Sequence, residues 1–362
     1  MAGVTLTRVA TLASREEVVE CRLRNHRGTE AAVLTLGATL RTLIVADARG
    51  AASDVVLGYD TVEEYLQGRE YFGATIGRYA NRIGKGRLSV AGTVHQLALN
   101  SGHNSEHGGE QGFDRRLWAL DGTSAEGGAA VTLSLVSPDG DQGFPGELRV
   151  RLTYTLTDDD ALRLDYAATT SAPTVVNLTN HTYWNLAGAA CGEALGARLS
   201  IEADAYTPVD ENLVPTGEIR PVEGTALDFR TPQVVAARIR DGTETQLTVG
   251  CGYDHNFVLR GVPGKLRPAA RLEDARSGRV LELVTTEPGL QLYTGNALSG
   301  AILGKDRRLY RQGDGIALET QHYPDSPNQP RFPSTVLEPG RVWTSTTVYR
   351  FSTRRPRRPT RR

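Results

Sequence analysis

One stretch of the chain concentrates side chains that can move protons and bind polar ligands. Residues 177–186, Asn-Leu-Thr-Asn-His-Thr-Tyr-Trp-Asn-Leu, contain an imidazole at His181, two aromatic rings and three amides. Buried polar groups that lack a partner cost about 1–3 kcal/mol each. The stretch therefore predicts either polar groups that pair with one another inside the protein or the lining of a polar cavity. His181 alone does not distinguish a structural histidine from a catalytic one.

Further polar clusters supply the remaining groups of a candidate site. They are Asn81-Arg82, residues 104–107, residues 252–257, residues 289–296 and residues 316–326. Together they offer an arginine, an aspartate, a glutamate, histidines and amides, with Tyr and Trp rings to lie against a pyranose, which is the usual lining of a sugar site. Each cluster alone also has a structural interpretation: Asp254 could cap a turn, and Glu319 could form a salt bridge with Arg82.

These residue types favour proton transfer over nucleophilic catalysis. The sequence has no G-x-S-x-G motif, and no Ser, Cys or Lys stands out as an activated nucleophile. Unperturbed His and Glu titrate near ~6.5 and ~4.3. Near neutral pH a glutamate can therefore accept a proton, and the protonated fraction of a histidine can donate one. Glu319 follows the apolar residues 315–318, so we expect its side chain to start partly buried.

Two glycine-rich loops suggest other ligands, but neither has the required pattern. Residues 73–86 are basic, yet they contain neither G-x-x-x-x-G-K-[ST] nor G-x-G-x-x-G before a helix, so nucleotide binding is poorly supported. His103 and His107 have the spacing of a metal pair on a helix, but the surrounding glycines favour a loop. We therefore predict no metal site.

The elements that must position these residues are mainly β-strands. Residues 131–136 and 148–156 alternate apolar and polar side chains, and three aspartates at 158–160 form a turn into residues 162–166. This pattern predicts a β-hairpin. Further strands are expected at residues 31–36, 40–45, 173–176, 280–284 and 342–351.

Few segments have the helical period. The best is residues 60–68, with Asp60 as the N-cap, Glu63 in the capping-box position and Gly68 as the stop. Many strands, short turns and almost no helix predict an all-β protein, a sandwich or barrel of antiparallel sheets with few short helices.

Composition indicates one large globular domain with a short basic tail. The chain has 362 residues and a formal net charge of −1, and six arginines fall in residues 354–362. The body, residues 1–353, thus has a formal net charge of −7. This charge does not indicate nucleic-acid binding. We predict a single domain over 1–353 and a disordered tail over 354–362, because the tail is broken by prolines and carries one sign of charge.

Cysteines and hydropathy bear on location. Three cysteines lie far apart and outside any C-x-x-C spacing, which argues against a disulfide framework. The N-terminus has no apolar h-region, and no apolar run approaches ~18 residues. We expect a cytoplasmic protein without a membrane segment.

In order along the chain, these clusters resemble the motifs of one family, the aldose 1-epimerases or galactose mutarotases. The matching segments are residues 77–83, 107–114, 177–186, 212–218, 252–257, 291–296 and 318–326. They span nearly the whole chain except the tail. The resemblance implies a large antiparallel β-sandwich of the galactose mutarotase type. It also implies an enzyme that interconverts the α and β anomers of free hexoses, such as D-galactose and D-glucose, without a metal or cofactor.

The resemblance also implies roles for individual residues. His181 would be the general acid that protonates the ring oxygen, and Glu319 the general base that takes the proton of the C1 hydroxyl. The sugar would be held by Asn81, Arg82, His107, Tyr183, Asp254 and Gln291. In one detail the chain departs from the family pattern: Ser105-Glu106 precedes His107 where an apolar residue is more usual. The arginine-rich tail is not a family feature either.

Other functions stay open at this stage. The chain could be a sugar-binding protein without catalysis, or an epimerase for another aldose or for a hexose 6-phosphate, although Arg78 and Arg82 are the only obvious basic residues for a phosphate. A purely structural role for the polar clusters is a further alternative. The expected partner is a small monosaccharide, with no nucleic acid and no membrane. The sequence does not decide between a monomer and a dimer.

Overall fold

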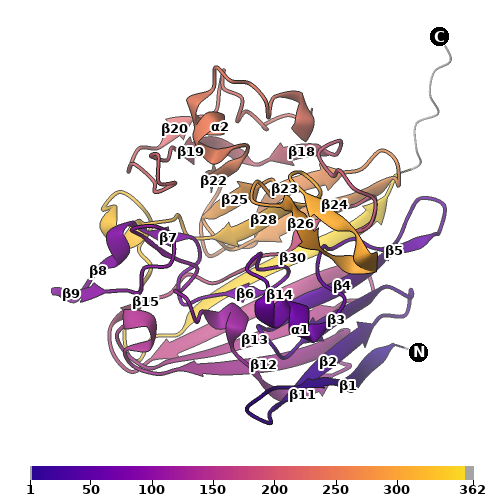
Figure 1. The fold of residues 1–362 in the computed structure, drawn as a ribbon, viewed down its shortest axis with the longest axis horizontal. Helices are drawn as coiled ribbons and strands as arrows, with labels where there is room; N and C mark the ends of the chain where they lie inside the picture. The colour runs from indigo at the N-terminus through magenta and orange to yellow at the C-terminus, as the bar shows by residue number, and fades with distance from the viewer. Residues whose placement is uncertain (1, 355–362) are drawn as a thin grey trace.

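Three antiparallel sheets contain most of the strands in the computed structural model, which describes residues 2–354 (Figure 1). A nine-stranded sheet has the order β11 (Ala119–Ser124), β12 (Ala129–Ser137), β13 (Leu148–Leu156), β14 (Ala161–Thr170), β30 (Trp343–Thr353), β24 (Arg279–Thr285), β23 (Arg267–Glu273), β18 (Arg198–Ile201) and β21 (Gln233–Val234). A six-stranded sheet has the order β17 (Tyr183–Trp184), β28 (Ile316–Gln321), β25 (Gly289–Tyr293), β22 (Asp254–Leu259), β19 (Ala203–Thr207) and β20 (Arg220–Pro221). A five-stranded sheet runs in chain order through β1 (Gly3–Thr11), β2 (Glu17–Arg24), β3 (Glu30–Leu34), β4 (Thr39–Ala46) and β5 (Ala52–Asp54).

The remaining elements are short. The two-stranded pairs are β6 (Thr75–Ile76) with β16 (Thr179–Asn180), β7 (Arg82–Ile83) with β10 (Ser105–Glu106), β8 (Arg87–Val90) with β9 (Thr93–Gln96), β15 (Thr174–Val175) with β29 (Val336–Leu337), and β26 (Ser299–Leu303) with β27 (Leu309–Arg311). The α-helices are α1 (Val62–Gln67) and α2 (Thr245–Gly250). The 3₁₀ turns are η1 (Gly84–Gly86), η2 (Phe113–Arg115), η3 (Asp141–Gly143), η4 (Val235–Ala237), η5 (Lys305–Arg307) and η6 (Ser326–Asn328).

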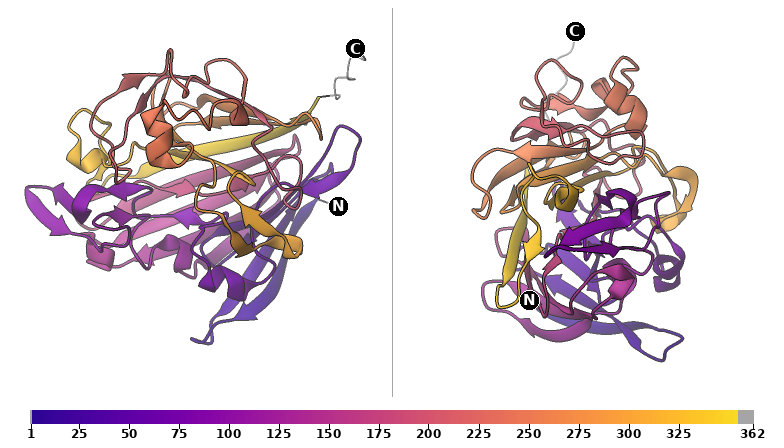
Figure 2. Two further views of the ribbon diagram at one scale, coloured as in Figure 1. Left: turned by 45° about the horizontal axis from the view of Figure 1, so that its top comes forward. Right: turned by 90° about the vertical axis from the view of Figure 1, so that its left-hand side faces the viewer.

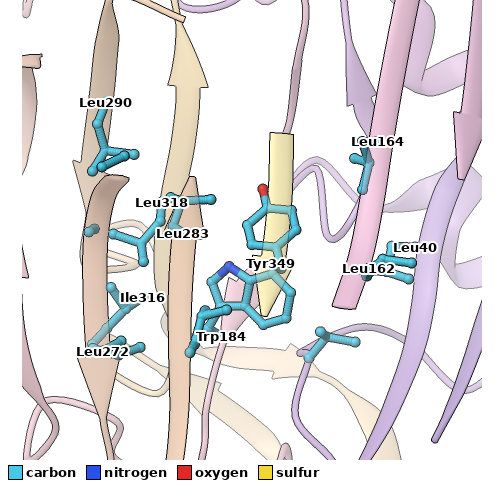
Figure 3. Packing of buried hydrophobic residues seen from close by; sticks show 14 of the residues in the cluster. Leu40, Leu162, Leu164, Trp184, Leu272, Leu283, Leu290, Ile316, Leu318 and Tyr349 are labelled. Atoms are coloured by element: carbon cyan, nitrogen blue, oxygen red, sulfur yellow. The ribbon is translucent and has the colours of Figure 1, made fainter. Parts of the chain in front are cut away.

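One hydrophobic core joins the three sheets. Along β13 the residues from Leu148 to Leu156 are alternately buried and more exposed, as expected for a sheet with one face in the core. The same core cluster contains Leu40 from the five-stranded sheet and Leu318 from the six-stranded sheet. Figure 3 shows these leucines with Tyr349 of β30 and Trp184, whose rings lie 4.8 Å apart. Both smaller sheets therefore pack on the inward face of the nine-stranded sheet.

The predicted fold class is confirmed, and most predicted strands are present. The 148–156 and 162–166 segments pair as the hairpin β13–β14, and the last strand β30 lies between β14 and β24. Figure 2 shows from two further directions how this yellow strand runs beside the magenta strands of the same sheet. The 173–176 segment is shorter than expected, since β15 spans two residues.

The helix at 60–68 forms, but with a different cap. Its N-cap is Thr61, not Asp60, and the capping-box partner is Glu64, not Glu63. The Thr61 hydroxyl accepts from the Glu64 backbone N–H at 3.3 Å, and the Glu64 carboxylate accepts from the Thr61 N–H at 2.8 Å. The box holds two otherwise unpaired backbone donors, and shifting it by one residue places Val62 in the core. Gly68 ends the helix as predicted.

Three further predictions concern a membrane segment, the cysteines and the C-terminal tail. No helix within residues 2–354 is both long and apolar enough to cross a membrane. The cysteines are free: Cys21 is buried, and Cys191 and Cys251 are exposed. The predicted disordered tail lies, apart from Arg354, outside the described residues.

Candidate active site

A polar cavity of about 320 Å³ opens beside the six-stranded sheet. Its lining contains seven of the eight residues predicted for the site, contributed by segments from every third of the chain. The lining residues are Arg69, Glu70, Tyr71, Asn81, Arg82, Glu106, His107, His181, Tyr183, Asp254, Tyr293, Ala297, Leu298 and Glu319. The eighth predicted residue, Gln291, lies next to this lining and donates from Nε2 to Asp254 Oδ1 at 2.6 Å.

The floor of the cavity is the face of the six-stranded sheet that points away from the core. Alternate residues of β28 point to opposite faces: Ile316 and Leu318 join the hydrophobic core, so Glu319 points to the other face. In the sheet register Gln291 of β25 lies directly opposite Glu319. Glu319 is 2% exposed, and its Oε2 is buried without a hydrogen-bond partner among the described residues. A buried carboxylate oxygen without a partner is costly unless a ligand or water reaches it.

The stretch at 177–186 divides its polar groups between structure and site. Its three amides are structural: Asn177 bonds to the backbone of Ala80 and His322, Asn180 to Gly73 O and Tyr154, and Asn185 to Gly192 O and Asp314 O. These bonds fasten the short strands β15, β16 and β17 to neighbouring loops. His181 and Tyr183 remain free to line the cavity, with their rings 4.9 Å apart. The amides thus pair mainly with groups of other segments and not with one another, while His181 and Tyr183 line a polar cavity, the second alternative posed by the sequence.

His181 and Glu319 face each other across the cavity. His181 Nε2 lies 3.7 Å from Glu319 Oε1, and the side chains are 5% and 2% exposed. His181 Nδ1 is buried without a partner within residues 2–354. The separation is slightly too long for a direct hydrogen bond. A small polar group inserted between the two side chains could contact both.

The backbone around His107 and Asn81 fixes a second imidazole. Both residues have left-handed backbone conformations, with φ of 49° and 63°, which are uncommon for residues other than glycine and cluster at functional sites. The Asn81 N–H donates to His107 Nδ1 at 3.1 Å. Nδ1 is therefore the acceptor nitrogen, and the Nε2–H of a neutral imidazole is the donor left for a ligand.

Arg82 brings together the acidic groups of the wall. Its guanidinium lies 2.7 Å from Glu106 Oε1 and 3.9 Å from Asp254 Oδ2. The structure therefore contradicts the two structural interpretations considered from sequence, a salt bridge between Glu319 and Arg82 and a turn cap at Asp254. Arg82 pairs with these acids, and no Arg82–Glu319 ion pair is found within residues 2–354. Asp254 begins strand β22 and does not cap a turn.

Burial controls the charges of the site. Burial lowers the pKa of His181 to about 3, and the neighbouring His107 lowers it further. Burial also lowers the pKa of His107 to about 3, with the charge of Arg82 as the second cause. It raises the pKa of Glu319 well above its usual value, and the carboxylates of Asp254 and Glu106 raise it further. The pKa of Asp254 is raised by burial, which Arg82 and Gln291 oppose. A low dielectric thus disfavours every isolated charge here.

The cavity also contains a set of groups that a metal ion could accept. Ligand atoms of His107, His181 and Glu319 all lie within 4.8 Å of one another. Two imidazoles and a carboxylate suit several transition metals. The expectation of a metal-free site therefore stays a prediction. His103, the other half of the histidine spacing considered from sequence, lines a different groove next to η1.

Sequence reasoning missed part of the lining. Arg69, Glu70 and Tyr71 follow α1 directly, and the Tyr71 ring lies 4.7 Å from that of His107. Their polar and aromatic types just after a helix-stopping glycine were the available hint. Two further histidines near the motifs lie outside the cavity lining: His255 is fully buried, and His322 pairs with Glu287 at 2.7 Å.

The sheets and the cavity, with an imidazole and a carboxyl group poised for proton transfer, define an all-β protein with a sugar-type site. Comparison with known proteins identifies the class. The family model for aldose 1-epimerase matches residues 20–350. Galactose mutarotase of Homo sapiens is 48% identical over 320 residues, 88% of this chain and 90% of that protein. Aldose 1-epimerase of Escherichia coli K12 is 37% identical over 332 residues, 91% and 94% of the two chains.

Comparison with solved structures gives the same family. The crystal structure of galactose 1-epimerase from Lactobacillus acidophilus NCFM superimposes with a TM-score of 0.86 at 30% sequence identity, covering 98% of this chain and 99% of that chain. The chain belongs to the aldose 1-epimerase family. It is an isomerase that acts on monosaccharides, as predicted from its motifs.

Proposed function

We propose that the enzyme interconverts the α and β anomers of free hexoses such as D-galactose and D-glucose, with His181 as the general acid and Glu319 as the general base. The observation that carries this proposal is the facing pair itself, with His181 Nε2 and Glu319 Oε1 3.7 Å apart in a polar cavity. The galactose mutarotase and the galactose 1-epimerase named above support the choice of galactose. Asn81, Arg82, His107, Tyr183 and Asp254 hold the hydroxyl groups, and Gln291 orients Asp254.

The reaction needs two proton transfers on the sugar. Glu319 takes the proton of the C1 hydroxyl while His181 gives a proton to the ring oxygen, and the C1–O5 bond breaks to give the open-chain aldehyde. Rotation about the C1–C2 bond presents the other face of the aldehyde. Closure reverses both transfers with the roles exchanged, so protons and electrons balance over one turnover. The enclosed cavity keeps the open chain in place until it closes.

These transfers require the pair to hold one proton in total. Burial favours the neutral form of the free enzyme, in which Glu319 is protonated and His181 is neutral. The reactive form, a carboxylate facing an imidazolium, has the same number of protons and differs by one transfer across the 3.7 Å gap. A bound sugar places its C1 hydroxyl and ring oxygen beside the pair, on the cavity side, and gives both groups polar partners, which favours the charged form.

Polarimetry of freshly dissolved α-D-galactose tests the proposal. The wild-type protein should accelerate the drift to equilibrium, and His181→Ala or Glu319→Gln should each lower kcat/KM by about 10²–10⁴-fold, the usual contribution of a general acid or base. Thermal unfolding should show both variants folded. Treatment with a chelator should leave the wild-type rate unchanged if the site is metal-free.

The pair His322–Glu287 offers matched controls. It is a second His–Glu pair, 2.7 Å apart and mostly buried, but it lies outside the cavity lining. Glu287→Gln and His322→Ala should lower stability yet leave activity per folded molecule near wild type. If Glu319→Gln stays within tenfold of wild type, Glu319 is not the base. Sugar binding without turnover would instead indicate a binding protein.

A hexose 6-phosphate is a weaker candidate substrate. The two arginines of the lining, Arg69 and Arg82, share the cavity with four carboxyl groups. Comparing turnover of galactose and galactose 6-phosphate decides between the two. For location, we propose the cytoplasm, because two exposed free cysteines, Cys191 and Cys251, suit a reducing compartment.

A further inference from the structure

The substrate cavity has more acidic than basic groups. Arg69 and Arg82 face four carboxyl groups, those of Glu70, Glu106, Asp254 and Glu319. Both histidines of the lining are neutral near pH 7, since their pKa values are about 3. The cavity is therefore either negatively charged or takes up protons to avoid that charge. Even with Glu319 protonated, the three other carboxylates outnumber the two arginines, so the formal charge stays negative and its field opposes an anion and favours a cation.

Glu106 is the acidic group whose surroundings bear most directly on this charge. It lies on β10, directly opposite Arg82 of β7. Asn100 fixes its backbone twice: Glu106 N–H donates to Asn100 Oδ1 at 2.8 Å, and Asn100 Nδ2 donates to Glu106 O at 2.9 Å. The side chain is 18% exposed. The carboxylate is thus held at the cavity wall by a short, well-anchored strand.

The two oxygens of this carboxylate have different surroundings. Oε1 lies 2.7 Å from Arg82. Oε2 has no hydrogen-bond partner within residues 2–354, and it is not among the fully buried unpaired atoms, so it keeps some accessible surface. One oxygen thus neutralises Arg82, and the other is free to accept a hydrogen bond from a ligand.

This arrangement changes what Arg82 can offer a substrate. A lone guanidinium in a sugar site would attract a carboxylate or phosphate and pair with it in a bidentate way. Here Glu106 at 2.7 Å and Asp254 at 3.9 Å already compensate the charge. An anionic sugar would have to displace these acids or approach them, because both line the same cavity of about 320 Å³.

We propose that Glu106 sets the charge specificity of the enzyme, so that it prefers hexoses bearing a protonated amine, such as 2-amino-2-deoxyhexoses, over neutral hexoses and discriminates against sugars with a carboxylate or phosphate. The inference rests on the proposed function, because it concerns the substrate of the same site. It adds a substrate class, the cationic amino sugars, and a residue that selects for it.

The experiment measures kcat/KM by polarimetry at pH 6.5 for three sugars of one configuration: D-galactose, 2-amino-2-deoxy-D-galactose and D-galacturonate. For the wild type we expect the amino sugar to exceed galactose and galacturonate to fall at least about tenfold below it, a magnitude typical of one partly screened charge pair. In Glu106→Gln the amino sugar/galactose ratio should fall about tenfold and the galacturonate/galactose ratio should rise. We compare ratios of kcat/KM between two sugars because a change that affects all sugars equally, such as a general loss of activity, cancels in the ratio.

Two controls separate charge from shape. Glu110→Gln removes the same charge from an exposed position of the same loop, outside the cavity lining, and should leave both ratios unchanged. The second control uses the wild type alone: an amine of this kind loses its proton near pH ~8. The preference for the amino sugar should disappear at pH 9.5, where the amine is neutral. This second control also holds if Glu106→Gln fails to fold.

The outcomes distinguish this inference from the proposed function. Acceleration of galactose with no preference for the amino sugar at pH 6.5, or with a preference unchanged in Glu106→Gln, overturns the role of Glu106 and leaves the proposed function standing. No acceleration of any of the three sugars overturns both. A preference that is lost in Glu106→Gln and at pH 9.5 supports the inference.

Discussion

His181 and Glu319 are coupled by burial and by their 3.7 Å separation, so they titrate as a pair. In the proposed mechanism, activity requires the pair to hold one proton. Adding a second proton would give an imidazolium beside a carboxylic acid, and removing the last one would leave a neutral imidazole beside a carboxylate. Each of these states lacks either the base or the acid. The pH limits of activity therefore report the two proton affinities of the pair and not those of free His and Glu.

This argument predicts an unusually low acid limit. The second proton must go onto His181, whose pKa is lowered to about 3 by burial and by His107, so the one-proton state persists below pH 6.5. The first proton is held by Glu319, whose pKa is raised well above its usual value by burial and by nearby carboxylates, so it is lost only at higher pH. We expect kcat/KM for galactose to stay nearly constant from pH 7 down to about pH 5. Stopped-flow polarimetry checks this, with far-UV circular dichroism at each pH to show that the protein is folded. A fall centred near pH 6.5 would contradict the prediction.

Individual residues also show where sequence reasoning works. His181, Glu319, Asp254 and Arg82 were predictable because each lies in a motif whose polar types have no function in an ordinary strand. The three amides of residues 177–186 could not be assigned from sequence, because their partners lie on segments far away in the chain. Tyr71 reaches the cavity only through tertiary packing against His107. No periodicity marks such a residue.

At the scale of elements, a hairpin attached by a buried lysine forms part of the cavity wall. Ala297 and Leu298, which line the cavity, lead directly into β26 and β27. Lys305, in the turn between these strands, inserts its ammonium among Arg41 O, Asp54 Oδ2 at 2.6 Å and Val56 O at 2.8 Å. Burial lowers the pKa of Lys305, and the carboxylate of Asp54 opposes this effect. The three acceptors use all the donors of the ammonium group.

Removing this lysine should loosen the hairpin. Lys305→Met leaves Asp54 without its cationic partner, and breaking a buried pair costs about 3–5 kcal/mol. We expect a loss near the lower end, because Asp54 remains 22% exposed. Urea denaturation measures the loss, and KM for galactose should rise because Ala297 and Leu298 are held less firmly. Lys265→Met, at an exposed loop, is the control and should change neither quantity. Equal urea midpoints for Lys305→Met and wild type would show that the anchor is not needed.

Long elements were easier to predict than short ones. In the hairpin β13–β14, alternation runs through the 9 residues of β13 and from Leu162 to Tyr166 in β14, and the register follows from this pattern. The strands that bring His181 and Tyr183 to the cavity, β16 and β17, span two residues each, too few for any period to appear. Their position depends on side-chain bonds to other segments. The sheets of the sandwich could thus be predicted, but the small elements that build the site could not.

At the scale of the whole molecule, the two halves of the chain share one sheet and one core. This favours a single domain over residues 1–353, which we propose. The last strand, β30, pairs with β14 on one side and with β24 on the other. It therefore joins the strands formed by the first half of the chain to those formed by the second half. The core cluster likewise extends from Cys21 in β2 to Phe351 in β30. A boundary anywhere in the middle of the chain would cut both the nine-stranded sheet and the core.

This connectivity predicts one cooperative unfolding transition despite the length of the chain. The three tryptophans report on different regions: Trp118 lies beside the start of the nine-stranded sheet, Trp184 in the six-stranded sheet and Trp343 at the start of β30. Urea unfolding followed by tryptophan fluorescence and by far-UV circular dichroism should give coincident curves, because β30 links the two halves of the nine-stranded sheet and one core links the three sheets. A truncated chain ending at residue 341, which lacks β30, should fail to fold, since both halves of the sheet lose their shared strand. Shortening to residue 354 removes only the positions beyond the described structure and is the matched control, expected to unfold like the full chain. Two separated transitions, or a folded product of the 341-residue chain, would show that the halves are independent domains.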